Sequence, residues 1–318
     1  MIARIRFPLL KIGASALCLT MGTVATSSCG SDIDEENIGN FTDADGNTFK
    51  ITRMGQYYYN YDAQGRLTSF SNGEDQYNFD KDMNIVANYS GIEYADIKVS
   101  YNSKGYIVKL TGKSDYDDED EQGTLKVTMN ISYSGNHLTS IKTEYRDEWR
   151  DEDGKHYEEE NTTTKLTWQN DQLTEYQTEE QHKHDDGENH TDKTSCVFAY
   201  NKTDAVNPLQ QPFLAMFEQI QEFEEFLEPL GLIGLFGSGP AIFPTAYECY
   251  DIISETQHGA RLGRALSYDL NSNGTINTEY IGGVRYGYSY TSHDARSLMQ
   301  PAQSGKRYVI TPLHRRKR

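Results

Sequence analysis

Three histidines and three carboxylates fall within one short stretch of the chain, and this combination of side chains is typical of sites for transition metals. They are His182, His184, His190, Asp185, Asp186 and Glu188. Imidazoles two residues apart share a face only on a straight strand, and a mobile loop would not hold them together. A site for Zn²⁺ or another divalent ion and a solvated loop without a ligand both stay open, so no metal is committed.

A second candidate is the segment DLNSNG, in which Asp269, Asn271 and Asn273 match the first positions of a calcium loop. The bidentate Glu that such a loop needs at its twelfth position is absent, because Tyr280 stands there. The segment also coincides with a turn of the repeat described below. We therefore expect a turn, with a calcium site as the alternative.

No constellation of residues indicates catalysis. The sequence lacks a GxSxG elbow, an HExxH helix and a Gly-rich phosphate loop. Its 48 acidic residues form too many carboxylate pairs to single out a glycosidase pair. With 30 basic residues and a net charge of −18, the chain is also unsuited to nucleic acid. We expect a protein that is not an enzyme and carries no cofactor.

The chain begins like an exported protein. Arg4, Arg6 and Lys11 precede a largely apolar stretch that ends at Thr26, which is the layout of a signal peptide over residues 1–28. The small residues before Cys29 resemble a bacterial lipobox, whose Cys carries diacylglycerol and palmitate. An ordinary secreted protein with a free Cys is the alternative.

The expected location follows from this anchor. Residues 29–40 form an acidic tether, which resembles the signal that sends lipoproteins to the outer face of the outer membrane. We expect membrane lipid to be bound through Cys29, at the outer membrane and at the cell surface. Cys196 and Cys249 are then the remaining thiols. Export permits a disulfide between them, and two buried thiols are the alternative.

A repeat of aromatic, polar turn and aliphatic residue positions these candidates. It recurs, for example, at Tyr61 to Leu67 and at Tyr101 to Ile107. The aliphatic residue is followed three positions later by another apolar residue, as in Leu67 and Phe70, so a bulge is predicted after each turn. Between the turns, alternation such as that of residues 125–133 predicts half-buried antiparallel strands. About fourteen to sixteen strands follow, in an all-β up-and-down meander curled into a barrel or half-barrel.

The expected domains are a β domain at 41–291 and a polar tail with a basic end at 292–318. Spacing of Phe213, Phe217 and Ile220 predicts one amphipathic helix in an insert at about 208–229, which would plug one end of the barrel. Three acidic connections, 114–123, 145–161 and 179–193, are expected to be long loops on the opposite rim from the repeat turns.

The repeat unit resembles the YD repeat of Rhs-type proteins, in which it builds a sheet that curls into a shell. With Asp43-Ala44-Asp45-Gly46-Asn47 and the insert Asn207-Pro208-Leu209, the chain is similar to a Bacteroides-type lipoprotein family of unknown function with a porin-like fold. That resemblance covers roughly residues 29–290 and implies architecture only. Polar outward positions such as Lys126 and Lys165 predict a soluble barrel and not a membrane-spanning one.

Two functions are carried forward. The first is a surface-exposed binding module that captures a glycan or another nutrient, since off-parity tyrosines such as Tyr58 can stack on sugar rings. The second is an interaction protein that holds an outer-membrane partner protein.

Overall fold

A computed structural model describes residues 40–292, apart from residues 44, 73–75, 89–95, 118–121, 151–153, 186, 188, 202–205, 218–219, 221–223 and 255–256. The expected signal peptide, Cys29 and all of the polar tail after residue 292 lie outside the described residues. Within them, no helix is long and apolar enough to cross a membrane. The strands are β1 (Asn40–Thr42), β2 (Thr48–Met54), β3 (Tyr57–Tyr61), β4 (Leu67–Ser71), β5 (Gln76–Phe79), β6 (Ile85–Asn88), β7 (Asp96–Tyr101), β8 (Ile107–Asp117), β9 (Gln122–Ser134), β10 (His137–Arg150), β11 (Lys155–Gln169), β12 (Gln172–His184), β13 (Asn189–Ala199), β14 (Ala246–Ser254), β15 (Gln257–Leu270), β16 (Ile276–Ile281) and β17 (Val284–Ser292).

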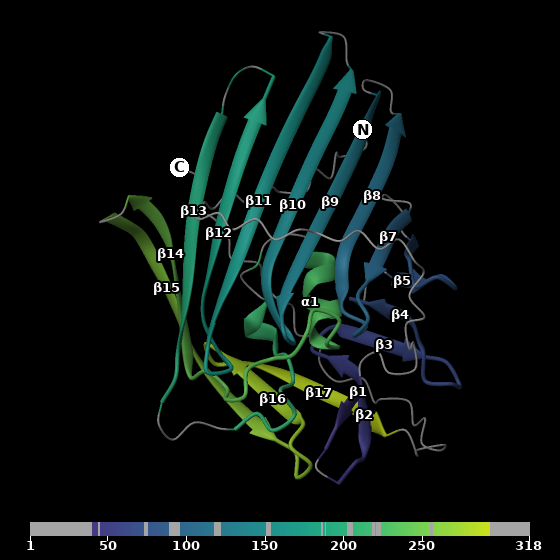
Figure 1. Cartoon of the computed structure of the whole chain (residues 1–318), viewed down its shortest axis with the longest axis vertical. Helices are drawn as coiled ribbons and strands as arrows, with labels where there is room; N and C mark the ends of the chain where they lie inside the picture. The colour runs from purple at the N-terminus through teal and green to yellow at the C-terminus, as the bar shows by residue number, and fades with distance from the viewer. Residues whose placement is uncertain are drawn as a thin grey trace.

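These strands form a closed antiparallel barrel (Figure 1). Each strand from β2 to β17 pairs with its neighbour in sequence, and β17 pairs back onto β2 through contacts such as Tyr288 with Met54. The ring therefore holds sixteen strands, and β1 pairs with β2 as an additional short strand. The predicted all-β meander is confirmed, and the barrel closes.

The repeat turns share one hydrogen-bond arrangement. In the turn after β3, Oδ1 of Asp62 accepts hydrogen bonds from the backbone N–H groups of Gln64 and Arg66, both at 2.9 Å. Gly65 adopts a φ of 84°, which favours glycine. The same acceptor role belongs to Asp43, Asp80 and Asn102. The polar residue of the repeat is thus the residue that closes the turn.

The predicted bulge after the turns is also confirmed. Between β3 and β4, Tyr61 pairs with Leu67 while Asn60 pairs with Ser69, so Thr68 is the extra residue. The hydroxyl of Thr68 donates to the carbonyl of Asn60 at 3.1 Å and satisfies an acceptor next to the bulge. Thr139 and Thr174 make the equivalent bond in two later hairpins. The extra residue brings both apolar residues of the unit, here Leu67 and Phe70, into the core.

The barrel is apolar inside and polar outside over much of its wall. In β9, alternate residues from Leu125 to Ile131 are buried in the core, while Lys126, Asn130 and Ser132 are exposed. A membrane-spanning barrel has the reverse arrangement, with an apolar band facing lipid. On the outer face, Arg146 of β10 forms ion pairs with Glu148 and with Glu159 of β11.

The expectation of three long acidic loops is wrong. Strands β8 to β13 are 11 to 15 residues long and stand as the tall side of the barrel in Figure 1, so most of the acidic residues lie within strands. The strand ends that these acidic segments join lie at the end of the barrel opposite the repeat turns, as predicted. These strand ends were predicted as loops because polar residues occupy both of their faces. The alternation of apolar and polar residues that indicates a strand is therefore missing there.

The insert between β13 and β14 fills the other end of the barrel. Its described helical parts are a short 3-10 helix at Leu214–Met216 (η2) and α1 at Glu224–Leu232, and the insert was expected at about 208–229. The residues from Phe213 to Met216 are all buried in the barrel. Phe213 has an extended backbone, and the next three residues form η2. Figure 1 places α1 among the strands, and the hydroxyl of Tyr59 donates to the carbonyl of Pro229 at 2.8 Å.

Candidate functional site

Polar side chains replace the apolar core on the inner face of the tall strands. Above the buried Leu166 of β11 and Tyr176 of β12, every second residue on both strands is Thr, Glu or His. These inward residues are Glu158, Glu160, Thr162, Thr164, Thr178, Glu180, His182 and His184. The barrel interior is therefore divided into an apolar half around the plug and a polar half toward the other rim.

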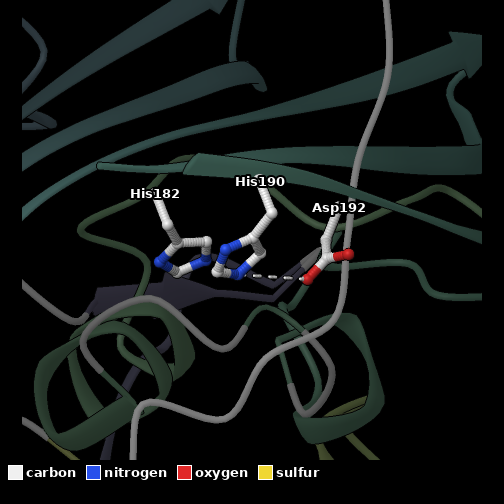
Figure 2. A group of neighbouring side chains, drawn as sticks. All are labelled: His182, His190 and Asp192. Atoms are coloured by element: carbon white, nitrogen blue, oxygen red, sulfur yellow. Dashed lines mark ion pairs between the residues drawn. The ribbon is translucent and has the colours of Figure 1, made fainter. Parts of the chain in front are cut away.

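Strand register brings five ionisable groups of this polar half together. Glu160 on β11 lies opposite His182 on β12, which lies opposite His190 on β13. Two residues along each strand, Glu180 lies opposite Asp192. We call Glu160, Glu180, His182, His190 and Asp192 the His–carboxylate cluster. Figure 2 shows that the side chains of His182, His190 and Asp192 extend from the same face of the sheet.

Distances within the His–carboxylate cluster are short. Nε2 of His182 lies 2.7 Å from Oε1 of Glu180, and Nδ1 lies 3.5 Å from Oε2 of Glu160. The imidazole rings of His182 and His190 stack with centroids 4.4 Å apart. Nε2 of His190 is 3.8 Å from Oδ2 of Asp192, the contact that is dashed in Figure 2. One ligand atom from each of His182, His190 and Asp192 lies within 4.8 Å of the others, and the same holds for Glu160, Glu180 and His182.

His182 and Glu180 are the buried members of the cluster, while His190 and Asp192 are partly exposed, and burial perturbs the proton equilibria of the inner groups. His182 is 1% exposed and Glu180 5%. Burial, reinforced by the Glu180 carboxylate, raises the pKa of Glu160 to about 7. Burial lowers the pKa of His182, but its contact with Glu180 and the charge of Glu160 outweigh that effect and raise this pKa above its usual value.

The structure therefore brings together two of the three predicted histidines. His184 lies farther out, with its ring centroid 6.5 Å from that of His190 and Nε2 3.8 Å from Oε1 of Glu158. Asp185 pairs instead with His156 at 2.7 Å, while Asp186 and Glu188 lie outside the described residues. Glu160, Glu180 and Asp192 were missed by the sequence analysis. Glu180 and Asp192 each lie two residues from a histidine, and residues two apart on a strand face the same side. This spacing could have identified them, but the segment was expected to be a loop.

The calcium-like segment forms a repeat turn. Oδ2 of Asp269 accepts a hydrogen bond from the hydroxyl of Tyr280 at 2.9 Å. Asn271 bonds to Thr275 through both its backbone N–H and its side-chain amide. Oδ1 of Asn273 accepts from the backbone N–H and the hydroxyl of Thr275, at 3.2 and 2.8 Å. The hydrogen bonds of Asn271 and Asn273 thus close the turn, whereas Asp269 lies in β15 and bonds across to β16.

The same turn lines a hollow at the rim next to the plug. Its volume is about 410 Å³, and amide, hydroxyl and aromatic side chains surround it. The lining consists of Phe49, Asn271, Asn273, Thr275, Asn277, Tyr288, Ser289, Tyr290 and Thr291. The hollow, which we call the rim hollow, is thus built from β2, β16, β17 and the turn after β15.

A buried carboxylate supports the floor of this end of the barrel. Glu279 on β16 accepts hydrogen bonds from the backbone N–H groups of Leu214 and Ala215 in η2, at 2.8 and 3.0 Å, and from the hydroxyl of Tyr288 at 2.7 Å. It is 0% exposed. Burial, together with the nearby charge of Glu279, raises the pKa of Tyr288 well above its usual value, so this phenol remains a donor.

Cys196 on β13 and Cys249 on β14 lie directly opposite each other and form a disulfide. Both side chains face the core, as the parity of Cys196 with Phe198 indicated. The bond joins neighbouring strands on either side of the insert, across 53 residues of sequence.

Comparisons with known proteins extend to the fold alone. No family model and no curated protein matches the chain. Among solved structures, it is similar to a porin-like protein from Bacteroides vulgatus, with 13% identity and a TM-score of 0.43 over 80% of this chain and 98% of that one. A porin-like protein from Bacteroides uniformis has 14% identity and a TM-score of 0.45 over 81% and 98% of the two chains.

Proposed function

We propose that this protein is a non-catalytic lipoprotein of the outer membrane that captures a saccharide at the rim hollow. The observation that carries the proposal is the lining of the hollow, in which three asparagines and several hydroxyls surround aromatic rings. Amides both donate and accept hydrogen bonds, as sugar hydroxyls do, and aromatic rings pack on the apolar faces of sugars. A volume of about 410 Å³ is in the usual range of small-ligand sites.

The outer wall is a poorer candidate for the same ligand. Among the large apolar and aromatic side chains described as exposed, Tyr58 is the one aromatic, at 43% exposure. The guanidinium of Arg53 lies over its ring, 5.2 Å from the centroid. A lone ring covered by a cation offers less stacking area than the rim hollow does.

A thermal melt of the full chain against a panel of polysaccharides tests the binding role. A saccharide at a hundred times its dissociation constant adds about 2.7 kcal/mol of stability, or roughly 5–10 °C for a chain of this size. Ser289→Trp, which fills the hollow, and Asn277→Ala, which removes an amide, should abolish the shift. Asn130→Ala on the outer face of β9 is the control and should retain it. A flat panel, or a shift that both hollow variants retain, would contradict the proposal.

The anchor is tested separately. Radiolabelled palmitate should enter the wild-type chain and a Cys18→Ala control, and should not enter Cys29→Ala. Protection of the protein from protease added to whole cells would refute surface exposure.

A second candidate, the holding of a partner protein, rests on an apolar hollow on the outer face of β13–β15. Val197, Ala199, Ala246, Gly263 and Ala265 contribute to its lining. A photo-crosslinking residue at Val197 should capture a defined partner in cells, whereas the same residue at Asn130 should not. Equal labelling at both positions would exclude this surface.

A further inference from the structure

We infer that the His–carboxylate cluster is a binding site for a divalent transition metal of the zinc class, held by His182, His190, Asp192 and Glu180. This site lies in the polar half of the interior and is built from strands other than those of the rim hollow. The inference is therefore independent of saccharide binding.

The donor set selects the metal. Two imidazole nitrogens and two carboxylates suit Zn²⁺ and its neighbours, whereas Ca²⁺ and Mg²⁺ prefer oxygen alone. The ligand atoms of His182, His190 and Asp192 already lie within 4.8 Å of one another, and Glu180 is 2.7 Å from His182. Zinc bonds of about 2.0–2.2 Å place neighbouring ligand atoms roughly 3.5 Å apart. A bound ion would therefore draw these ligand atoms closer together than they lie in its absence.

His182 is the strongest indication of a ligand. It is 1% exposed, and its Nδ1 has no hydrogen-bond partner within the part of the chain that the structure describes. That atom faces Oε2 of Glu160 at 3.5 Å, which likewise has none there. With a metal on Nε2, Nδ1 carries the proton and donates to Glu160. A carboxylate that orients a metal-binding histidine in this way is a recurrent feature of zinc sites.

The charge of the cluster points the same way. Three carboxylates face two imidazoles, and the ion pairs described for these carboxylates involve histidine alone. Lys183 and Arg146 pair with Glu159, which points outward from the barrel. A divalent cation would neutralise this negative charge, of which the part on Glu180 is buried away from water.

Calorimetric titration of the metal-stripped full chain with Zn²⁺, together with the absorption spectrum of Co²⁺, tests the inference. We expect one ion per chain and a tetrahedral Co²⁺ spectrum. His182→Ala and His190→Ala should each weaken binding more than tenfold, and Glu160→Gln should weaken it about tenfold. His258→Ala is the matched control, because this exposed histidine lies on β15, and it should bind as the wild type does.

Asp192→Asn keeps the inference testable if the buried variants fail to fold, because that side chain is 40% exposed. It should lower Zn²⁺ affinity while the metal-free melt remains as in the wild type. Absence of Zn²⁺ binding by the wild-type chain would overturn the inference. So would an affinity for Zn²⁺ in His190→Ala and Asp192→Asn that equals that of the wild type. Neither result affects the saccharide proposal, whose variants lie at the rim hollow.

Discussion

Glu279 offers the sharpest test of how the barrel and its plug are joined. Replacement by Ala removes the acceptor of three donors, namely the N–H groups of Leu214 and Ala215 and the hydroxyl of Tyr288. The position is fully buried, so these donors are left without water. Each unsatisfied buried donor costs about 1–3 kcal/mol. Removal of a desolvated carboxylate offsets part of that loss, and we expect Glu279→Ala to lower the free energy of unfolding by about 3–5 kcal/mol.

A double-mutant cycle separates the Tyr288 contact from the rest. Tyr288→Phe alone should cost about 1.5–3 kcal/mol, since it removes a hydrogen bond to a charged group. In the absence of Glu279 the same change removes an orphaned donor, so the two effects should fall short of additivity by about 1–2 kcal/mol.

Urea unfolding of the oxidised protein, followed by fluorescence and circular dichroism, measures these free energies. Hydrogen exchange by mass spectrometry should show faster exchange at the amides of Leu214 and Ala215 in Glu279→Ala. The exposed Glu144 on β10 supplies the control, for which Ala should change stability by less than about 0.5 kcal/mol. A Glu279→Ala protein as stable as Glu144→Ala would refute the reasoning.

Other predictions concern the hairpins. Asp62→Ala should cost about 1–2 kcal/mol in urea unfolding, and Asp62→Asn should cost less than that, because Asn102 performs the same role in another turn. Burial opposes ionisation of Asp62, but hydrogen bonds and the nearby guanidinium lower its pKa. The stability that this shift contributes is present above the ordinary pKa of Asp, near 4, and is lost as the pH falls through the folded value. Urea unfolding should therefore show a larger advantage of the wild type over Asp62→Asn at pH 7 than at pH 3. Thr68→Val should cost about 1 kcal/mol by the same assay, and an unchanged value would show that the hydroxyl contributes nothing to the bulge. Replacement of Cys196 and Cys249 by Ser should lower stability by up to about 4 kcal/mol for a 53-residue separation, and dithiothreitol should then have no further effect.

Much of the architecture is predictable from the sequence because the repeat encodes it locally. Each unit specifies its own turn and bulge, as the bonds of Asp62 and Thr68 illustrate. Closure of the barrel is not encoded in this way. It depends on the pairing of Met54 with Tyr288, which are distant in sequence, and no motif near either residue identifies the other as its partner. The course of the helical insert is not encoded locally either. The backbone of η2 is held by Glu279, a residue of another hairpin.

The candidate sites were less accessible to sequence reasoning. His182 and His190 could be chosen by residue type, but their neighbours Glu160 and Asp192 become relevant only when the strands align. Polar residues on both faces concealed these strands. The asparagines of the turn after β15 were identified because their spacing matches that of a calcium loop. The rim hollow that they line also needs residues of β2 and β17.

The pairing of β17 with β2 has a consequence for how the protein matures. The chain is synthesised from its N-terminal end, so β2 is complete long before β17, the strand that covers its edge. Until then the backbone groups of Phe49, Ile51 and Arg53 present a template to which another chain can add a strand. Pairing of β17 with β2 therefore removes the last open edge of the sheet. A chain truncated before Val284 should assemble edge to edge into oligomers.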